Sequence, residues 1–261
     1  MPIEQVLKSD IEEIVARLGD AAQRFSGKTV LLTGANGFLG RSFSELFSLL
    51  NATVLEKPVT LIGLDKSNSS PGGNESPVDQ PHIRLIKHDV VQPFTWEEPL
   101  DFIIHAAGIP SPFYYRAYPL ETLHISITGT QNMLELAQQH HARFVFFSSS
   151  EIYGDPDPKH VPMAESYSGN VSCQGPRAYA GLASSYFEKV TEDFHRFDDR
   201  RRITFQRGYD SLGHAGSSTR SQTTSVKYSS IVSLYTVFTS RAERPDSACY
   251  PMQIGDTAMA D

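Results

Sequence analysis

Three glycines separate a strand pattern from a helix pattern near the start of the chain. The strand pattern is KTVLLT at 28–33. The loop TGANGFLG then places glycine at 34, 37 and 40, immediately after the strand and opening the helical segment GFLGRSFSELFSLL. Such glycines permit a tight turn, a close approach of backbone to a phosphate, and close packing of helix on sheet. The free N–H groups of the helix N-terminus attract the phosphate. The sequence therefore predicts a strand–turn–helix unit that binds a dinucleotide.

Short apolar segments recur after this unit, with helical patterns between them. Further strands are predicted at 59–65, 83–89, 101–108 and 143–150, and a helix is predicted at 120–139. This alternation is typical of a parallel sheet that helices cover on both faces. The predicted fold class is α/β, a doubly wound parallel sheet of the Rossmann type.

Acidic and small residues at the predicted strand ends indicate which dinucleotide binds. Asp65 is placed to accept hydrogen bonds from the adenosine ribose and to repel a 2′-phosphate, which favours NAD over NADP, although Lys66 beside it softens the preference. Asp89 is placed to bind the adenine amino group; for both aspartates, an ordinary turn cap is the alternative. The small residues of HAAG, 105–108, let a cofactor lie across the strand ends, and His105 is expected to be packed and not catalytic. The expected NAD site comprises Gly34, Asn36, Gly37, Phe38, Leu39, Gly40, Asp65, Asp89, Val90, Ala106, Ala107, Gly108 and Ser148.

The two ends of the chain have weaker patterns. Apolar residues at near-helical spacing over 3–25 predict an amphipathic helix packed on the main domain, with a dimer contact as the alternative. Beyond residue 210 the sequence is rich in serine and threonine and lacks periodicity. The predicted organisation is an N-terminal helix at 1–26, an NAD-binding domain with an active-site segment at 27–210, and a partial or atypical substrate lobe at 211–261.

Composition argues against several classes of binding partner. The net charge of -7 argues against a nucleic-acid partner, because no basic field exists to hold phosphates. The two cysteines have no metal-ligand or disulfide spacing, and no metal is expected. The N-terminus lacks the apolar core of a secretory signal, and no apolar run is long enough to span a membrane. These features predict a soluble, cytoplasmic protein without a membrane partner.

Several motifs, taken in order, resemble the extended short-chain dehydrogenase/reductase family of nucleotide-sugar epimerases and dehydratases. They are TGANGFLG, HAAG and SSSEIYG. The combination of IPSPFYYRAYPLETL, ITGTQNMLELA, RFVFFSSSEIYGDP and GNVSCQGPRA is similar to the branch of UDP-glucuronate decarboxylases. The similarity covers about residues 27 to 178.

The resemblance implies a hydride shuttle with tightly held NAD. In the family, a tyrosine assisted by a lysine removes the proton of the sugar 4-hydroxyl while hydride leaves C4; the 4-keto acid then loses CO2 and hydride returns. The resemblance assigns a hydroxyl-binding serine to Ser149 and the acidic residue of the decarboxylase and dehydratase branches to Glu151, and it makes Tyr179 the candidate tyrosine. A UDP-sugar substrate and a homodimer are also implied. The expected substrate contacts are Tyr115, Asn170 and Arg177.

The segment GPRAYAGLASSYFEKV, 175–190, departs from the family pattern. If Tyr179 is the catalytic tyrosine, Ala183 replaces its lysine; an alignment without a gap instead puts Ala180 and Ser184 at the tyrosine and lysine positions. Neither alignment contains a Tyr-x-x-x-Lys pair. A tyrosine without a neighbouring cation titrates near pH 10, about three units above neutrality, and is a poor base there.

These observations leave more than one function open, and whether the chain is an enzyme stays uncertain because the pair is missing. The first expectation is NAD-dependent decarboxylation of UDP-glucuronate. The alternative is a catalytically impaired NAD-binding homologue or a truncated fragment, since family members continue further than this chain. A nucleotide-sugar 4-epimerase or dehydratase is the second alternative.

Overall fold

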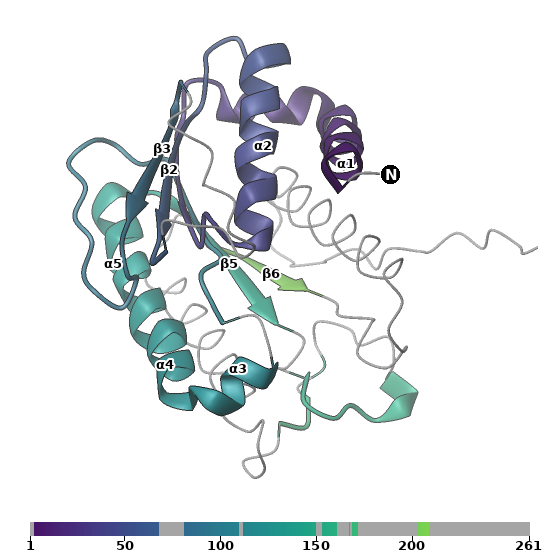
Figure 1. Ribbon diagram of the computed structural model, residues 1–261, viewed down its shortest axis with the longest axis vertical. Helices are drawn as coiled ribbons and strands as arrows, with labels where there is room; N and C mark the ends of the chain where they lie inside the picture. Colours follow the sequence, from purple (N-terminus) through teal and green to yellow (C-terminus); the bar gives the residue numbers. More distant parts are fainter. Residues whose placement is uncertain are drawn as a thin grey trace, which may run out of the picture.

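The computed structural model describes residues 3–67, 81–109, 112–149, 153–160, 167, 169–171 and 203–208 (Figure 1). Helices and strands alternate within these ranges. The helices are α1 (Ile3–Leu18), α2 (Phe38–Thr53), α3 (Pro112–Ala117), α4 (Pro119–His124) and α5 (Thr130–His140), with shorter helical segments η1 (Gly19–Phe25), η2 (Ile125–Gly129) and η4 (Pro158–His160). The strands are β1 (Thr29–Thr33), β2 (Thr60–Asp65), β3 (Ile83–Lys87), β4 (Phe102–His105), β5 (Arg143–Ser149) and β6 (Ile203–Gly208).

Within the described part of the chain, six strands form one sheet in which all neighbours are parallel. The strand order is β3-β2-β1-β4-β5-β6, so the direction of winding reverses beside β1. Thr33, the last residue of β1, pairs with Leu64 of β2 and with His105 of β4. The carboxyl ends of three strands therefore meet at the switch point where doubly wound sheets bind ligands. The predicted Rossmann-type fold class is confirmed; the lobe predicted at 211–261 lies outside the described residues.

Both faces of the sheet are buried because side chains alternate between them along each strand. In β1, Val30 and Leu32 pack with residues of α1 and α2, whereas Leu31 packs with residues of α5. Phe47 of α2 and Met133 of α5 are fully buried in these two clusters. Figure 1 shows α2 and α5 on opposite sides of the sheet. The resulting three layers hold the strand ends, and hence the switch point, in fixed positions.

The N-terminal helix packs on the main domain, as its apolar stripe predicts. Ile11, Ile14 and Leu18 of α1 are buried in the same cluster as the α2 side chains. Phe25, at the end of η1, extends this contact: its ring centroid lies 5.3 Å from that of Phe47. The regular α-helix is shorter than the predicted segment, because it ends at Leu18 and the tighter η1 follows.

The helix predicted at 120–139 is interrupted by a short π-helical segment. α4 ends at His124, the π-helical η2 follows, and α5 begins at Thr130. Such segments are rare inside helices and are frequent at functional sites. The side-chain amide of Asn132 donates to the Val90 carbonyl at 2.8 Å, which ties α5 to the loop that follows β3. The helix is therefore fixed beside the carboxyl ends of the strands.

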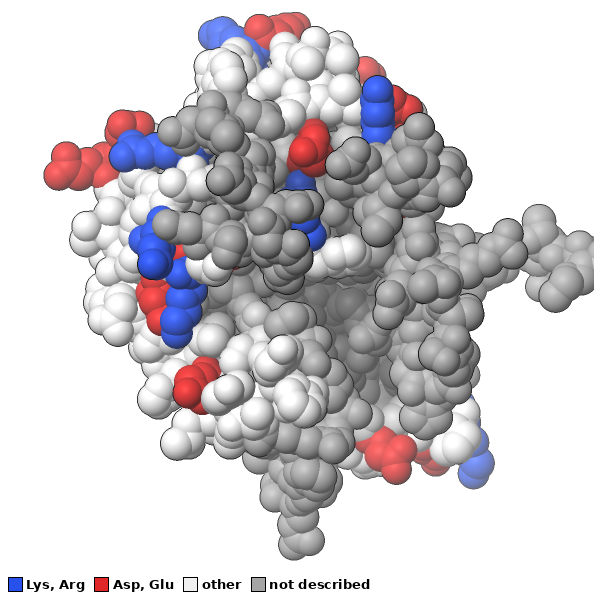
Figure 2. Space-filling model, viewed as in Figure 1, with Lys and Arg blue, Asp and Glu red and all other residues white. Residues whose placement is uncertain are grey.

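Charged side chains of both signs are interspersed on the face shown in Figure 2. Blue and red groups lie next to one another there, without a continuous patch of one sign over the described residues of this face. None of the helices in the described part of the chain combines the length and the apolarity needed to cross a bilayer.

Replacing Ile14 by alanine tests the packing of α1. Ile14 is only 2% exposed, and removing a buried isoleucine side chain leaves a cavity, so we expect Ile14→Ala to lower the free energy of unfolding by about 2–5 kcal/mol. The exposed Glu12 on the same helix supplies the control, Glu12→Ala, with an expected effect within about 0.5 kcal/mol. Urea denaturation measures both. Equal, small effects would show that α1 does not pack as described.

Candidate functional site

The turn after β1 can be made only by glycine at its first position. Gly34 has a φ of +71°, and a Cβ atom there would lie 2.9 Å from the Ala106 carbonyl oxygen. Its N–H donates to the Leu64 carbonyl at 2.8 Å. A Cβ atom on Gly40 would overlap the Gly34 carbonyl, so the helix can start this close to the turn only with glycine there. The tight turn and close packing predicted from the glycine spacing are both present.

The N-terminus of α2 presents free backbone donors beside this turn. The first helical hydrogen bond runs from the Arg41 N–H to the Gly37 carbonyl, at 3.1 Å. The N–H groups of Phe38, Leu39 and Gly40 therefore have no acceptor within the helix. Gly37 stands at the N-cap and brings no side-chain cap. Together with the helix dipole, these donors form a site for an anion such as a pyrophosphate.

Asp65 connects the glycine loop to the turn after β2. One carboxylate oxygen accepts the Asn36 N–H at 2.9 Å, and the other accepts the Ser67 N–H at 3.0 Å. The Asn36 side-chain amide donates to the Ser67 carbonyl, which closes the same ring of contacts. Each carboxylate oxygen has a second lone-pair direction available to a ligand hydroxyl. Asp65 thus caps the turn and can also accept a hydrogen bond from a ribose.

Asp89 and Lys66 form an ion pair across two neighbouring strand ends. The Lys66 Nζ lies 3.0 Å from Asp89 Oδ2, and Asp89 Oδ1 accepts the Val91 N–H at 3.2 Å. Burial alone would raise the pKa of Asp89, but the Lys66 ammonium and the Val91 N–H outweigh it and hold this pKa below its usual value. Asp89 is therefore a carboxylate at neutral pH and presents a charged acceptor.

Thr33 and His105 form a buried polar pair beneath the strand ends. The Thr33 hydroxyl accepts the N–H groups of Ala106 and Ala107, at 3.2 and 3.1 Å, and its oxygen lies 2.7 Å from His105 Nδ1. A hydroxyl that accepts twice has one hydrogen left to donate, so Nδ1 is the acceptor and the His105 proton resides on Nε2. The imidazole packs against the ring of Phe146, with centroids 6.0 Å apart. The expectation of a packed histidine is confirmed.

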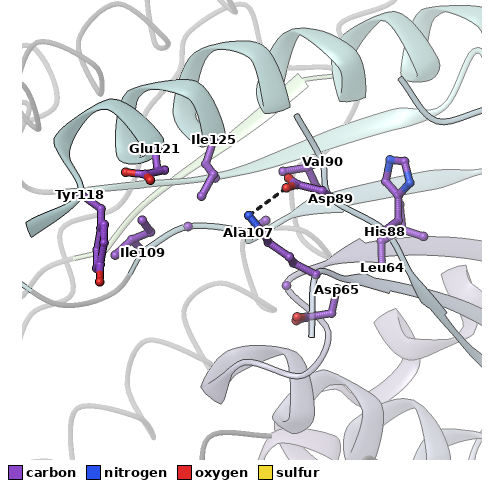
Figure 3. Close-up of a pocket in the computed structure, with 13 residues that line it drawn as sticks. Leu64, Asp65, His88, Asp89, Val90, Ala107, Ile109, Tyr118, Glu121 and Ile125 are labelled. Carbon is purple, nitrogen blue, oxygen red and sulfur yellow. Dashed lines mark ion pairs between the residues drawn. The ribbon is translucent and has the colours of Figure 1, made fainter. Parts of the chain in front are cut away.

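A pocket of about 320 Å³ opens over these strand ends (Figure 3). In Figure 3, Asp65, His88 and Asp89 lie toward one end and Tyr118 and Glu121 toward the other. The volume is in the range of small-molecule sites, and the position is the switch point of the sheet. The described lining residues are Gly34, Leu64, Asp65, Lys66, His88, Asp89, Val90, Ala107, Gly108, Ile109, Tyr118, Glu121 and Ile125.

The pocket brings together many of the residues predicted to bind the cofactor. Those that line it are Gly34, Asp65, Asp89, Val90, Ala107 and Gly108. The others with described positions lie in the glycine loop and the start of α2, in the turn after β4, or at the end of β5; they are Asn36, Gly37, Phe38, Leu39, Gly40, Ala106 and Ser148. Their direct contact with a cofactor stays a prediction.

The predicted catalytic and substrate residues are described only in part. Ser149 is the last residue of β5 and pairs with Gly208 of β6, and Tyr115 lies in α3. Asn170 is exposed, and its N–H donates to the Tyr153 carbonyl at 2.9 Å, outside the pocket lining. The remaining three predicted residues, Glu151, Arg177 and Tyr179, lie outside the described residues.

The helical wall of the pocket was not predicted from the sequence. Tyr118, Glu121 and Ile125 line it from the N-cap of α4, from α4 and from η2. Their spacing of three and four residues was a signal that they share one face of a helix. However, the sequence did not indicate that this face lies over the strand ends.

The buried imidazole of His105 gives the protein a specific dependence of stability on pH. Burial lowers its pKa from 6.5 to about 4, so between these pH values the unfolded chain binds a proton that the folded chain does not. Stability therefore falls as pH falls from 6.5 toward 4, by about 3 kcal/mol for this group, and the group has no effect above 6.5. Urea denaturation at a series of pH values measures this slope.

The slope should become shallower in His105→Gln, which has no proton to bind in this range. His124→Gln, at an exposed histidine of α4, is the control and should retain the wild-type slope. An unchanged slope in His105→Gln would contradict the assignment of the effect to the buried imidazole.

Solved structures with a similar fold bind nucleotides. A UDP-glucose 4-epimerase from Bifidobacterium longum, solved with NAD+ and UDP, has a TM-score of 0.52 and 24% identity, over 69% of this chain and 52% of that chain. A dTDP-glucose 4,6-dehydratase from Streptomyces venezuelae, solved with NAD and TYD, has a TM-score of 0.53 and 22% identity, over 69% and 55% of the two chains. At this identity the likeness shows the shared fold.

Sequence relatives and a match to a family model identify the family of the chain. UDP-glucuronic acid decarboxylase 2 of Arabidopsis thaliana is 37% identical over 173 residues, 65% of this chain and 36% of that protein. UDP-glucuronic acid decarboxylase 1 of Xenopus tropicalis is 32% identical over 192 residues, 67% and 43% of the two. The chain thus spans less than half the length of these relatives. Residues 30–222 match the model of a family whose description names NAD as cofactor, as the sequence predicts. The chain belongs to the NAD dependent epimerase/dehydratase family.

Proposed function

We propose that this chain binds NAD across the pocket at the switch point and acts on a nucleotide sugar. The observation that carries the proposal is that the Gly34 turn and the Asp65 carboxylate meet at one opening over the strand ends, while the free N–H groups at the start of α2 follow in the same glycine loop. A cation would find few partners at the helix N-terminus, whereas a pyrophosphate with an attached ribose fits both the donors and the carboxylate. The arrangement of donors and acceptors therefore fits a dinucleotide.

The glycine loop and several residues of the pocket have defined tasks in this proposal. The N–H groups of Phe38, Leu39 and Gly40 hold the pyrophosphate, and Asp65 accepts the ribose hydroxyls. Val90 provides an apolar contact for the adenine, and the methyl group of Ala107 and the absence of a side chain at Gly108 leave room for the cofactor above β4. The nicotinamide end then points away from Asp65, toward the carboxyl end of β5 and Ser149.

For the substrate we propose UDP-glucuronate, with decarboxylation as the reaction. Support comes from the decarboxylase relatives and from SSSEIYG, which covers the end of the last strand predicted before the active-site segment and the residues after it. NAD, when bound, would supply the acceptor and later the donor of hydride at C4 of the sugar; in the 4-keto form the carboxyl group would leave as CO2 and a proton would take its place at C5. Ser149 would hold the 4-hydroxyl, and Glu151 would position the sugar or handle the proton near C5. A base on the chain must accept the proton of the 4-hydroxyl.

A second candidate function is NAD binding with impaired catalysis. The sequence observation that favours it is the absence of a Tyr-x-x-x-Lys pair at either alignment of 175–190. General base catalysis contributes about 10²–10⁴-fold to such reactions, so a chain without the pair would bind the cofactor and turn over slowly. Epimerisation or dehydration of a nucleotide sugar stays the further alternative, and analysis of the products distinguishes it from release of CO2.

Binding of NAD is tested first by direct titration. We expect NAD to bind the wild-type chain and to raise its melting temperature, because a ligand that binds only the folded state stabilises it. Asp65→Ala removes both a ribose acceptor and the anchor of the Asn36 N–H, so its dissociation constant should rise by about tenfold or more. Calorimetry measures the constant, and Asp20→Ala, at an exposed position of η1, is the control. No heat of binding with the wild type would refute the proposed cofactor.

Restoring the missing pair tests catalysis. If the site is otherwise assembled, Ala180→Tyr with Ser184→Lys should raise the rate of CO2 release from UDP-glucuronate by about 10²–10⁴-fold. Ala183→Lys tests the other alignment, in which Tyr179 is the catalytic residue. The control is Ala180→Phe with Ser184→Met, which adds similar bulk without an ionisable group. If neither restored pair exceeds this control, the substrate site is not assembled in this chain.

A further inference from the structure

Three charged groups at one end of the pocket, those of Asp65, Lys66 and Asp89, lie close to where an adenosine ribose would bind. Its described lining contains three carboxylates, from Asp65, Asp89 and Glu121, and one ammonium group, from Lys66. Lys66 directly follows Asp65 at the end of β2, so a lysine stands beside the residue that would accept the ribose hydroxyls. A lysine in this position is well placed to attract a phosphate on the 2′-oxygen, which would favour NADP.

The Lys66 ammonium is already paired with another group. Its Nζ lies 3.0 Å from Oδ2 of Asp89, a residue of the loop after β3, and the dashed line in Figure 3 marks this contact. The Lys66 side chain is 72% exposed, whereas that of Asp89 is 30% exposed and is fixed further by the Val91 N–H. The mobile partner is therefore the lysine, and the fixed partner is the aspartate.

We infer that Asp89 sets the preference for NAD over NADP by holding and neutralising Lys66. The inference rests on the proposed NAD site and concerns its selectivity. With the pair formed, the negative charge of Asp65 is not offset by a free cation, and a 2′-phosphate meets net repulsion. With Asp89 uncharged, Lys66 turns to the ribose and offers a 2′-phosphate a charge-assisted hydrogen bond.

Binding of adenine is compatible with the ion pair. A carboxylate oxygen has two acceptor positions, so Asp89 Oδ2 can accept the adenine amino group while it stays paired with Lys66. The pair therefore need not break when NAD binds. Nor does the pair contribute much to folding, because exposed ion pairs of this kind stabilise proteins only weakly. The pair matters for selectivity because it determines where the Lys66 ammonium lies.

The test compares the dissociation constants of NAD and NADP in the wild-type chain and in three variants. Asp89→Asn removes the charge but keeps an oxygen for the Val91 N–H, so this variant should fold normally. We expect it to bind NADP about tenfold more tightly than the wild type does, the effect of one partly screened charge beside a phosphate. Lys66→Gln should not gain NADP affinity. The double variant should lose the gain, because the released ammonium is no longer present.

The outcomes separate selectivity from cofactor binding. A gain in NADP affinity that appears in Asp89→Asn and disappears in the double variant supports the inference. A lower preference caused only by weaker NAD binding would overturn it, because Asp89 would then be a simple adenine contact. An equal gain in the single and double variants would also overturn it, since Lys66 would have no part. If the wild type binds neither dinucleotide, the proposed function itself fails, and the inference fails with it.

Discussion

Three parallel strands end side by side at the pocket, and each leaves backbone donors and acceptors that the ladder no longer pairs. The Thr33 hydroxyl accepts the N–H groups of Ala106 and Ala107, and the Gly34 N–H donates to the Leu64 carbonyl. These bonds join the ends of β1, β2 and β4 through groups of β1 and the residue after it. The pocket has this shape because the strand ends are held together from the centre of the sheet.

Backbone groups at the strand ends also hold the charged residues of the pocket in place. Asp65 uses both carboxylate oxygens to hold backbone N–H groups of the glycine loop and of the turn after β2, yet it still lines the pocket. Its orientation is therefore set before any ligand arrives, which lowers the entropic cost of binding. Asp89 is fixed in the same manner by the Val91 N–H. Preorganised carboxylates of this kind discriminate between ligands by charge and position.

Local patterns predicted the parts of the fold and site that depend on neighbouring residues. The strand, glycine loop and helix around Gly34 follow from residues that are adjacent in the chain, and Asp65 follows from its place at a strand end. The pairing of Lys66 with Asp89 could not be predicted, because it joins an exposed and a half-buried side chain that follow two strands, and only the assembled sheet defines the relative position of these strands. The only indication of this ion pair in the sequence was the lysine beside Asp65.

The helical wall of the pocket escaped prediction for a related reason. Tyr118, Glu121 and Ile125 reach the pocket because α4 and η2 cross near the strand ends, and η2 winds more widely than the regular helix that periodicity suggests. Helical periodicity identifies which residues share a face, but the direction of that face depends on the winding of each turn. A change from α to π winding rotates the following residues relative to the preceding ones. Tertiary packing decides this, and the apolar pattern alone does not contain it.

The described residues of the pocket and the residues proposed for catalysis come from different parts of this chain. The former lie between Gly34 and Ile125, whereas the proposed catalytic residues are Ser149, Glu151 and Tyr179. The described bonds that shape the pocket come from β1, β2 and β4 and from the loops that follow them. They hold the strand ends and the Asp65 carboxylate in place through groups that are not among the residues proposed for catalysis. Binding of a dinucleotide and turnover of a substrate are therefore separate properties to measure, because different side chains are proposed to carry them.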